Sequence, residues 1–123
     1  MTIQEAIQQA DALRPNQFGQ AAKLRWLSTL DGQIHAELLQ RCADAPGPFA
    51  GYGPETELQS AVLLVPYPYD ELYPRYLVMR IDLEHGEVDR YNNDAAAFNR
   101  LWQSFAGRYC RDHRPLGEAR LRF

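Results

Sequence analysis

The sequence predicts an all-α protein: a small helical bundle with a long loop between helices 2 and 3 and a flexible C-terminal tail. Three observations predict this fold class. Apolar residues recur at helical spacing along most of the chain, one proline- and glycine-rich segment interrupts them, and only one short apolar run resembles a strand. With 123 residues, 46% of them hydrophobic, the chain suits a single helical domain at 1–113, followed by an extended basic tail at 114–123.

The first helix is predicted to begin after Thr2. Thr2 is a suitable N-cap, and Glu5, three residues later, completes a capping-box pattern. The apolar residues recur at steps of four, three and three, which places them on one helical face: Ile3, Ile7, Ala10 and Leu13. Pro15 ends the helix, because its ring disfavours the helical conformation in Arg14.

A longer second helix is predicted from about Gln20 to Cys42. Its apolar stripe consists of Trp26, Leu27, Leu30, Ile34, Leu38 and Cys42. The dipeptide Asp31-Gly32 would indicate a hairpin turn in isolation. Because the stripe keeps its phase across this dipeptide, we predict one continuous helix and interpret Gly32 as a point of close approach.

Residues 44–60 are predicted to form a long loop, because three prolines and three glycines exclude a helix interior. Loops longer than about 12 to 15 residues are uncommon in compact domains and are often functional. The run AVLLV that follows, residues 61–65, is the one segment expected to be extended.

The third helix is predicted to begin at Asp70, a suitable N-cap, with Pro74 in the first turn, where a missing N–H costs little. Gly86 either separates this helix from a fourth or bends one long helix, which ends before Arg114. The apolar seam of this last part steps by four, three, four, three and four residues: Tyr91, Ala95, Phe98, Trp102, Phe105 and Tyr109.

The predicted core combines these stripes. It contains Trp26, Leu27, Leu30, Ile34, Leu77, Ile81, Phe98 and Trp102. On this basis Trp102→Ala is expected to cost about 3 to 5 kcal/mol, as a large-to-small change in a core does.

Tyrosines are concentrated in the stretch PYPYDELYPRY, residues 66–76. Tyr73 and Tyr76 share helix turns with the apolar stripe, which favours packing in the core or in a subunit interface. A stacking surface for single-stranded nucleic acid would need interleaved basic residues, and only two arginines lie near. We therefore assign Tyr69, Tyr73 and Tyr76 to a partner or oligomer interface, with core packing as the alternative.

No catalytic, cofactor-binding or metal-binding residue is predicted. In the acidic cluster DLEHGEVD, residues 82–89, Asp82 and His85 are spaced as metal ligands, but no second helix carries a matching Glu-x-x-His. A solvated acidic face is the favoured interpretation of this cluster. The serines lie in no nucleophile elbow, no glycine-rich phosphate loop is present, and Cys42 and Cys110 fit neither a zinc site nor a disulfide framework.

The charge is uneven along the chain. The net charge of −3 gives no general footprint for duplex DNA. From Arg108 onward five arginines against two acidic residues give +3, so residues 1–107 carry −6. A basic tail on an acidic body suggests contact with an acidic partner or a neighbouring copy, the alternative being a solvated tail. The residues assigned to this contact are Arg114, Arg120, Arg122 and Phe123.

Short motifs from residue 2 to about residue 109 occur together in an order that suggests a family. They are TIQEA at 2–6, PNQ at 15–17, WL at 26–27, LDG at 30–32, PYDELY at 68–73, YL at 76–77, ID at 81–82, YNN at 91–93 and FN at 98–99. In this collection the chain resembles small prophage-borne proteins related to the head-to-tail connector, or adaptor, proteins of long-tailed bacteriophages.

The resemblance implies a structural virion assembly protein whose copies form a ring below the portal, through which DNA passes. It implies the portal protein and neighbouring copies as partners, together with a head-completion or tail protein, and DNA only as passing cargo. The expected location is the bacterial host cytoplasm during assembly and then the virion neck, with no membrane contact. The alternatives are a helical prophage module that binds one protein or regulates without a ring, and a metal-binding or enzymatic bundle.

Overall fold

The computed structural model describes residues 1–42 and 46–113, which fold into four α-helices and one short 3-10 helix. In chain order they are α1 (Ile3–Leu13), α2 (Gln20–Glu37), η1 (Leu39–Arg41), α3 (Leu72–His85) and α4 (Val88–Asp112). The predicted all-α fold with a long gap between the second and third helices is confirmed. The assigned tail residues Arg114, Arg120, Arg122 and Phe123 lie outside the described residues.

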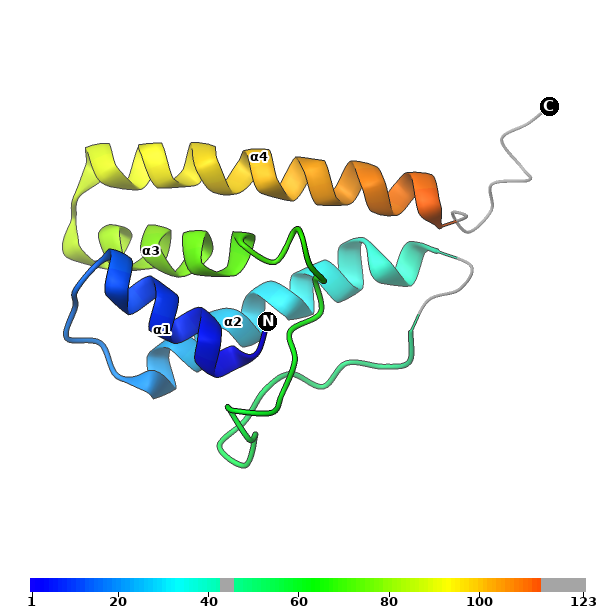
Figure 1. The fold of residues 1–123 in the computed structure, drawn as a ribbon, viewed down its shortest axis with the longest axis horizontal. Helices are drawn as coiled ribbons and strands as arrows, with labels where there is room; N and C mark the ends of the chain where they lie inside the picture. The colour runs from blue at the N-terminus through cyan, green and yellow to red at the C-terminus, as the bar shows by residue number, and fades with distance from the viewer. Residues whose placement is uncertain (43–45, 114–123) are drawn as a thin grey trace.

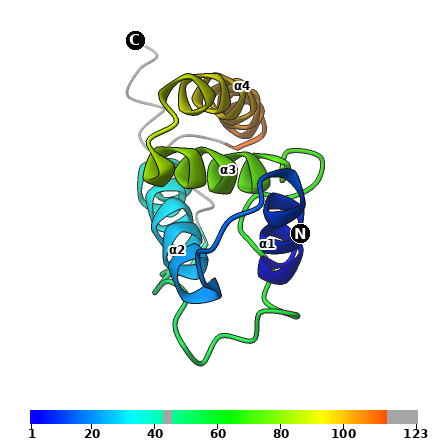
Figure 2. The same ribbon diagram turned by 90° about the vertical axis from the view of Figure 1, so that its left-hand side faces the viewer.

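The helices form three layers, with α3 in the middle (Figures 1 and 2). α4 lies antiparallel on one side of α3, while α1 and α2 lie side by side on the other. α3 contacts all three other long helices, so apolar residues are needed around most of its circumference. Its buried residues are Leu72, Tyr73, Pro74, Tyr76, Leu77, Val78, Ile81 and Asp82.

α1 begins as the sequence predicts. The Thr2 hydroxyl accepts a hydrogen bond from the Glu5 N–H at 3.2 Å, and the Thr2 N–H donates to the Glu5 carboxylate at 2.8 Å. The run AVLLV lies beside this helix start and forms an isolated antiparallel bridge between Val62 and Thr2. The Leu63 N–H donates to the Met1 carbonyl at 3.0 Å, so the start of the chain is tied to the segment that precedes α3.

α2 differs from its prediction in two respects. It ends at Glu37 rather than Cys42, and the chain tightens into η1, which still buries Leu39. The interpretation of Gly32 as a point of close approach is wrong, because a Cβ built at Gly32 meets nothing within 4 Å. The residue that matters in this dipeptide is Asp31, which is fully buried.

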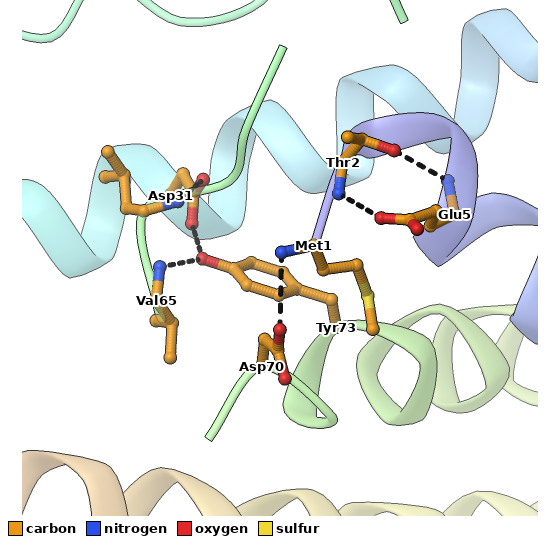
Figure 3. A network of polar contacts seen from close by, with 8 residues as sticks. Met1, Thr2, Glu5, Asp31, Val65, Asp70 and Tyr73 are labelled. Atoms are coloured by element: carbon orange, nitrogen blue, oxygen red, sulfur yellow. Dashed lines mark hydrogen bonds and ion pairs between the residues drawn. The ribbon is translucent and has the colours of Figure 1, made fainter. Parts of the chain in front are cut away.

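The start of α3 also corrects a prediction. Its N-cap residue is Glu71, without a side-chain cap, rather than Asp70. The Asp70 carboxylate instead pairs with the Met1 ammonium group at 3.3 Å (Figure 3), an ion pair of two largely buried groups. Pro74 lies in the first turn as predicted, and Gly86 ends the helix in the left-handed region at φ 74°. Two consecutive helices, rather than one bent helix, therefore complete the fold.

The core prediction is confirmed for six of its eight residues and corrected for two. Trp26, Leu27, Leu30, Ile34, Leu77 and Ile81 are buried. Phe98 and Trp102 are only half-buried, because α4 packs on α3 and leaves a hollow of about 300 Å³ between itself and α2. The seam residue that reaches the core is Phe105, which is 4% exposed.

Two buried carboxylates, on α3 and α4, face the partly buried guanidinium of Arg14, the C-cap residue of α1. The Arg14 guanidinium lies 3.1 Å from the carboxylate of Asp82 and 3.6 Å from that of Asp94. Asp82 is fully buried, which corrects its assignment to a solvated acidic face. Burial, together with a hydrogen bond to Asp82 and its negative charge, raises the pKa of Asp94 to about 6, although Arg14 and Arg75 oppose the shift.

Asp94→Asn should remove a pH dependence of stability. Between about pH 4 and pH 6 folded Asp94 holds a proton that the unfolded chain releases, so stability falls as pH rises through this window. Asparagine cannot ionise, so between pH 4 and pH 7.5 the free energy of unfolding of the variant should rise by about 1 to 2 kcal/mol relative to that of the parent chain. Denaturant unfolding of both chains at several pH values measures this rise. The prediction is contradicted if the difference between their free energies of unfolding is the same at every pH. Asp89→Asn, an exposed change on the same helix, is the control.

Candidate functional site

The candidate site is a groove of about 790 Å³ between the segment before α3 and the C-terminal part of α4. Its walls are mostly aromatic rings, prolines and leucines. The lining residues are Leu39, Pro46, Leu64, Pro66, Tyr67, Pro68, Tyr69, Phe105, Arg108, Tyr109, Asp112 and His113. A concave surface of this size and apolar character, with a few charged groups at its edge, is typical of a binding site.

One wall is the turn Pro66–Tyr69. The Tyr69 N–H donates to the Pro66 carbonyl at 2.9 Å, and the Leu72 N–H donates to the Tyr69 carbonyl at 3.3 Å, so the turn leads directly into α3. Prolines on both sides of Tyr67 restrict the backbone. Tyr67 is 85% exposed, the largest exposed fraction among the bulky hydrophobic residues that the structure describes. The turn therefore presents an aromatic ring to solvent from a constrained backbone.

The buried carboxylate of Asp31 holds the chain just before this turn (Figure 3). It accepts hydrogen bonds from the Tyr73 hydroxyl at 2.6 Å, from the Leu64 N–H at 3.1 Å and from the Tyr52 hydroxyl. The Tyr73 hydroxyl in turn accepts from the Val65 N–H at 2.8 Å. One side chain of α2 thus joins the long loop, the segment before the groove and α3.

The electrostatics of this network keep the hydroxyls as donors. Burial and the negative charge of Asp31 raise the pKa values of Tyr52 and Tyr73 far above the ordinary range of tyrosine. Burial also raises the pKa of Asp31 itself, while the hydrogen bonds from Tyr52, Tyr73 and Leu64 oppose that rise. Both hydroxyls therefore stay protonated and keep donating to Asp31, and these hydrogen bonds position the joined segments.

The opposite wall is the last part of α4. The Phe105 ring lies between those of Tyr69 and Tyr109, at centroid distances of 5.8 and 5.7 Å. Arg108 and Asp112 form an ion pair at 2.9 Å on the same helix and supply the charged edge. The groove therefore has an aromatic floor and a polar rim, as the centre and edge of a protein–protein interface do.

The structure separates the three tyrosines that the sequence assigned to an interface. Tyr69 lines the groove. Tyr73 is 0% exposed and Tyr76 is also buried, with its ring 5.4 Å from that of Phe98, so both offer no surface to a partner and belong to the core. Tyr67 was missed, although its position between two prolines in a loop was a usable signal.

Asp31 was missed for a different reason. It occupies the helical face of Leu27 and Ile34, four residues after one and three before the other, and a carboxylate in an apolar stripe indicates a buried polar contact. The same residue also belongs to the dipeptide Asp31-Gly32, whose turn signal obscured this indication. The donors that satisfy it lie 21 to 42 residues away in the chain, beyond the reach of local patterns.

The residues of the 82–89 cluster have separate partners. Asp82 faces Arg14, whereas the His85 ring stacks on Phe18 at 5.3 Å and contacts the Gln17 side chain at 3.3 Å. Among the residues that the structure describes, no three His, Cys, Asp or Glu side chains gather as a metal site requires.

No protein-family model, curated protein or solved structure matches this chain. Within residues 1–42 and 46–113, none of the helices combines the length and the apolar character that crossing a membrane requires.

Proposed function

We propose that this chain is a non-enzymatic subunit of a head-to-tail connector, an adaptor whose copies form a ring below the portal of a bacteriophage. The observation that carries the proposal is the aromatic groove, a surface suited to a protein partner. The resemblance of residues 2–109 to prophage-borne proteins related to connectors supports the neck as the assembly to which that partner belongs.

The composition of the groove supports a protein partner over a small metabolite. Tyrosine and arginine are the residues that most often dominate binding energy at protein interfaces, and the groove brings Tyr67, Tyr69 and Tyr109 together with Arg108. The Asp31 network fixes the segment before Tyr67, so little ordering entropy is lost when a partner binds.

The proposed partners are the portal protein, neighbouring copies of this chain, and a head-completion or tail protein. The negative charge of residues 1–107 supports a role for DNA as passing cargo, because an acidic body does not hold a polyanion as it slides. The subunit would be made in the bacterial host cytoplasm and would remain in the virion neck.

Imaging of purified neck complexes tests the proposal. Density for this four-helix fold, repeated around the axis beneath the portal, is the expected result. A neck without such density would contradict it. The mass of the purified protein in the presence of portal then separates a ring from a module that binds a single partner.

Tyr67→Ser should weaken binding to the portal or to the adjacent subunit about tenfold or more, because an exposed aromatic anchor is lost. The thermal midpoint should stay nearly unchanged, since Tyr67 is 85% exposed and contributes little to the core. Titration calorimetry with purified portal measures the affinity. Val62→Ser is the control, because Val62 is another exposed hydrophobic residue and does not line the groove. If Tyr67→Ser and Val62→Ser bound the portal with equal affinity, the groove would be excluded as the contact surface.

A further inference from the structure

The turn between α3 and α4 carries a second apolar surface, at the opposite end of α4 from the groove (Figure 1). Leu83 is 46% exposed and Val88 is 66% exposed, and both line a hollow of about 280 Å³. Gly86 and Tyr91 form more of its lining. We call this surface the turn patch. Two bulky hydrophobic residues exposed beside one hollow make this turn a candidate docking surface.

Acidic residues lie next to the turn patch in the sequence, and one of them, Glu87, lines the hollow. Glu84, Glu87 and Asp89 are exposed on this turn. Because Arg80 pairs with Glu84 at 3.6 Å, the carboxylates of Glu87 and Asp89 against the exposed base Arg90 give a charge of −1. Glu87 and Asp89 are the carboxylates of this turn without such an ion pair among the described residues. A ligand for this surface should be both basic and apolar.

Residues 114–123, RPLGEARLRF, have this chemistry. Three arginines, Arg114, Arg120 and Arg122, against Glu118 give +2, which is opposite in sign to the net charge of the turn patch. Leu116, Leu121 and Phe123 supply apolar side chains for the hollow. The segment therefore matches the turn patch in charge and in hydrophobicity.

The length of α4 determines whose tail can bind. α4 has 25 residues and is about 37 Å long, with the turn patch at its start and residue 114 just beyond its end. Ten fully extended residues reach at most about 33 to 36 Å. Even if fully extended, residues 114–123 of one chain would just approach its own turn patch, with no residues left to lie across it. The tail that binds there must come from another copy.

We propose that the basic segment 114–123 of one subunit docks on the turn patch of the next. This inference rests on the proposed ring assembly and names the contact between its neighbouring subunits. Because the two surfaces lie at opposite ends of α4, the contact is head-to-tail, and repetition gives a ring where the rotation closes. The arginines make the contact strongest at low ionic strength.

Sedimentation velocity of the full chain at low and high salt tests the proposal with paired charge reversals. Glu87→Lys with Asp89→Lys should weaken self-association at least tenfold at low salt, and so should Arg120→Glu with Arg122→Glu. The chain that carries all four changes should associate again, because the opposite charges are restored with exchanged positions. Glu55→Lys with Glu57→Lys alters net charge by the same amount on exposed loop residues and should have a much smaller effect.

Each outcome bears on the docking contact. Thermal melts first verify that every variant folds. If the fourfold variant remains dissociated, or if the loop reversals weaken association as much as those at the turn patch, the proposal is wrong. It is also wrong if the parent chain does not self-associate or if removal of residues 114–123 leaves association unchanged.

The two proposals fail separately. Suppose that imaging shows the ring in the neck but the charge reversals do not change self-association. This result would overturn the tail contact and leave the connector function intact. Restored association in the fourfold variant, with no density for the protein in the neck, would establish the tail contact and overturn the connector function.

Discussion

Asp31→Ala is expected to lower the free energy of unfolding by about 3 to 5 kcal/mol, which makes it among the most damaging single changes in this chain. The substitution leaves the partly buried Leu64 N–H without its acceptor and removes the acceptor of two tyrosine hydroxyls, of which that of Tyr73 is fully buried. An unsatisfied buried polar group costs about 1 to 3 kcal/mol, and the cavity of the lost carboxylate adds to this. Urea denaturation measures the change.

Two further variants distinguish the network from a general loss of packing. Tyr73→Phe keeps the ring and removes one hydroxyl, so it should cost about 1 to 3 kcal/mol, since Asp31 and the Val65 N–H each lose a partner. Asp89→Ala makes the same substitution at an exposed position and should stay within about 0.5 kcal/mol of the parent chain. A loss below 1 kcal/mol for Asp31→Ala would show that other groups or water satisfy the donors.

The existence and order of the helices could be predicted from sequence because local chemistry determines them. Each helix end depends on residues close to it in the sequence. Examples are the capping box at Thr2, the break after Arg14 and the left-handed cap at Gly86. The end of α2 was placed too late, since the apolar stripe continues in phase through η1 although the hydrogen-bond pattern changes. Periodicity shows which face is buried but not where the helix tightens.

The candidate site could be predicted only in part. The sequence drew attention to the tyrosine-rich stretch, and Tyr69 does line the groove. The sequence could not show that Tyr69 is accessible whereas Tyr73 and Tyr76 are buried. All three lie just before or within α3, and other helices cover both sides of α3. The groove itself depends on α4 extending beyond the start of α3, and this arrangement depends on tertiary packing rather than on spacing in the sequence.

The same limitation explains the error at Trp102. Its seam on α4 is apolar at every step, and the sequence does not show which of its residues meets a neighbouring helix. α4 contacts α3 and diverges from α2, so Phe98 and Trp102 border a hollow while Phe105 is enclosed. The expected cost of Trp102→Ala therefore falls to about 1 to 2 kcal/mol, closer to that of a typical point mutation.

Phe105→Ala should instead cost about 3 to 5 kcal/mol, because it removes a large ring that is only 4% exposed and contacts the rings of Tyr69, Trp102 and Tyr109. Denaturant unfolding of the two alanine variants gives the comparison directly. A conservative control, Phe105→Leu, should recover most of the loss by keeping apolar volume at the same position. If Trp102→Ala proved the more damaging change, α4 would have to pack against α2 in solution and close the hollow between them. The groove, whose wall depends on Phe105, would then have a different shape, so this comparison also tests the surface on which the proposed function rests.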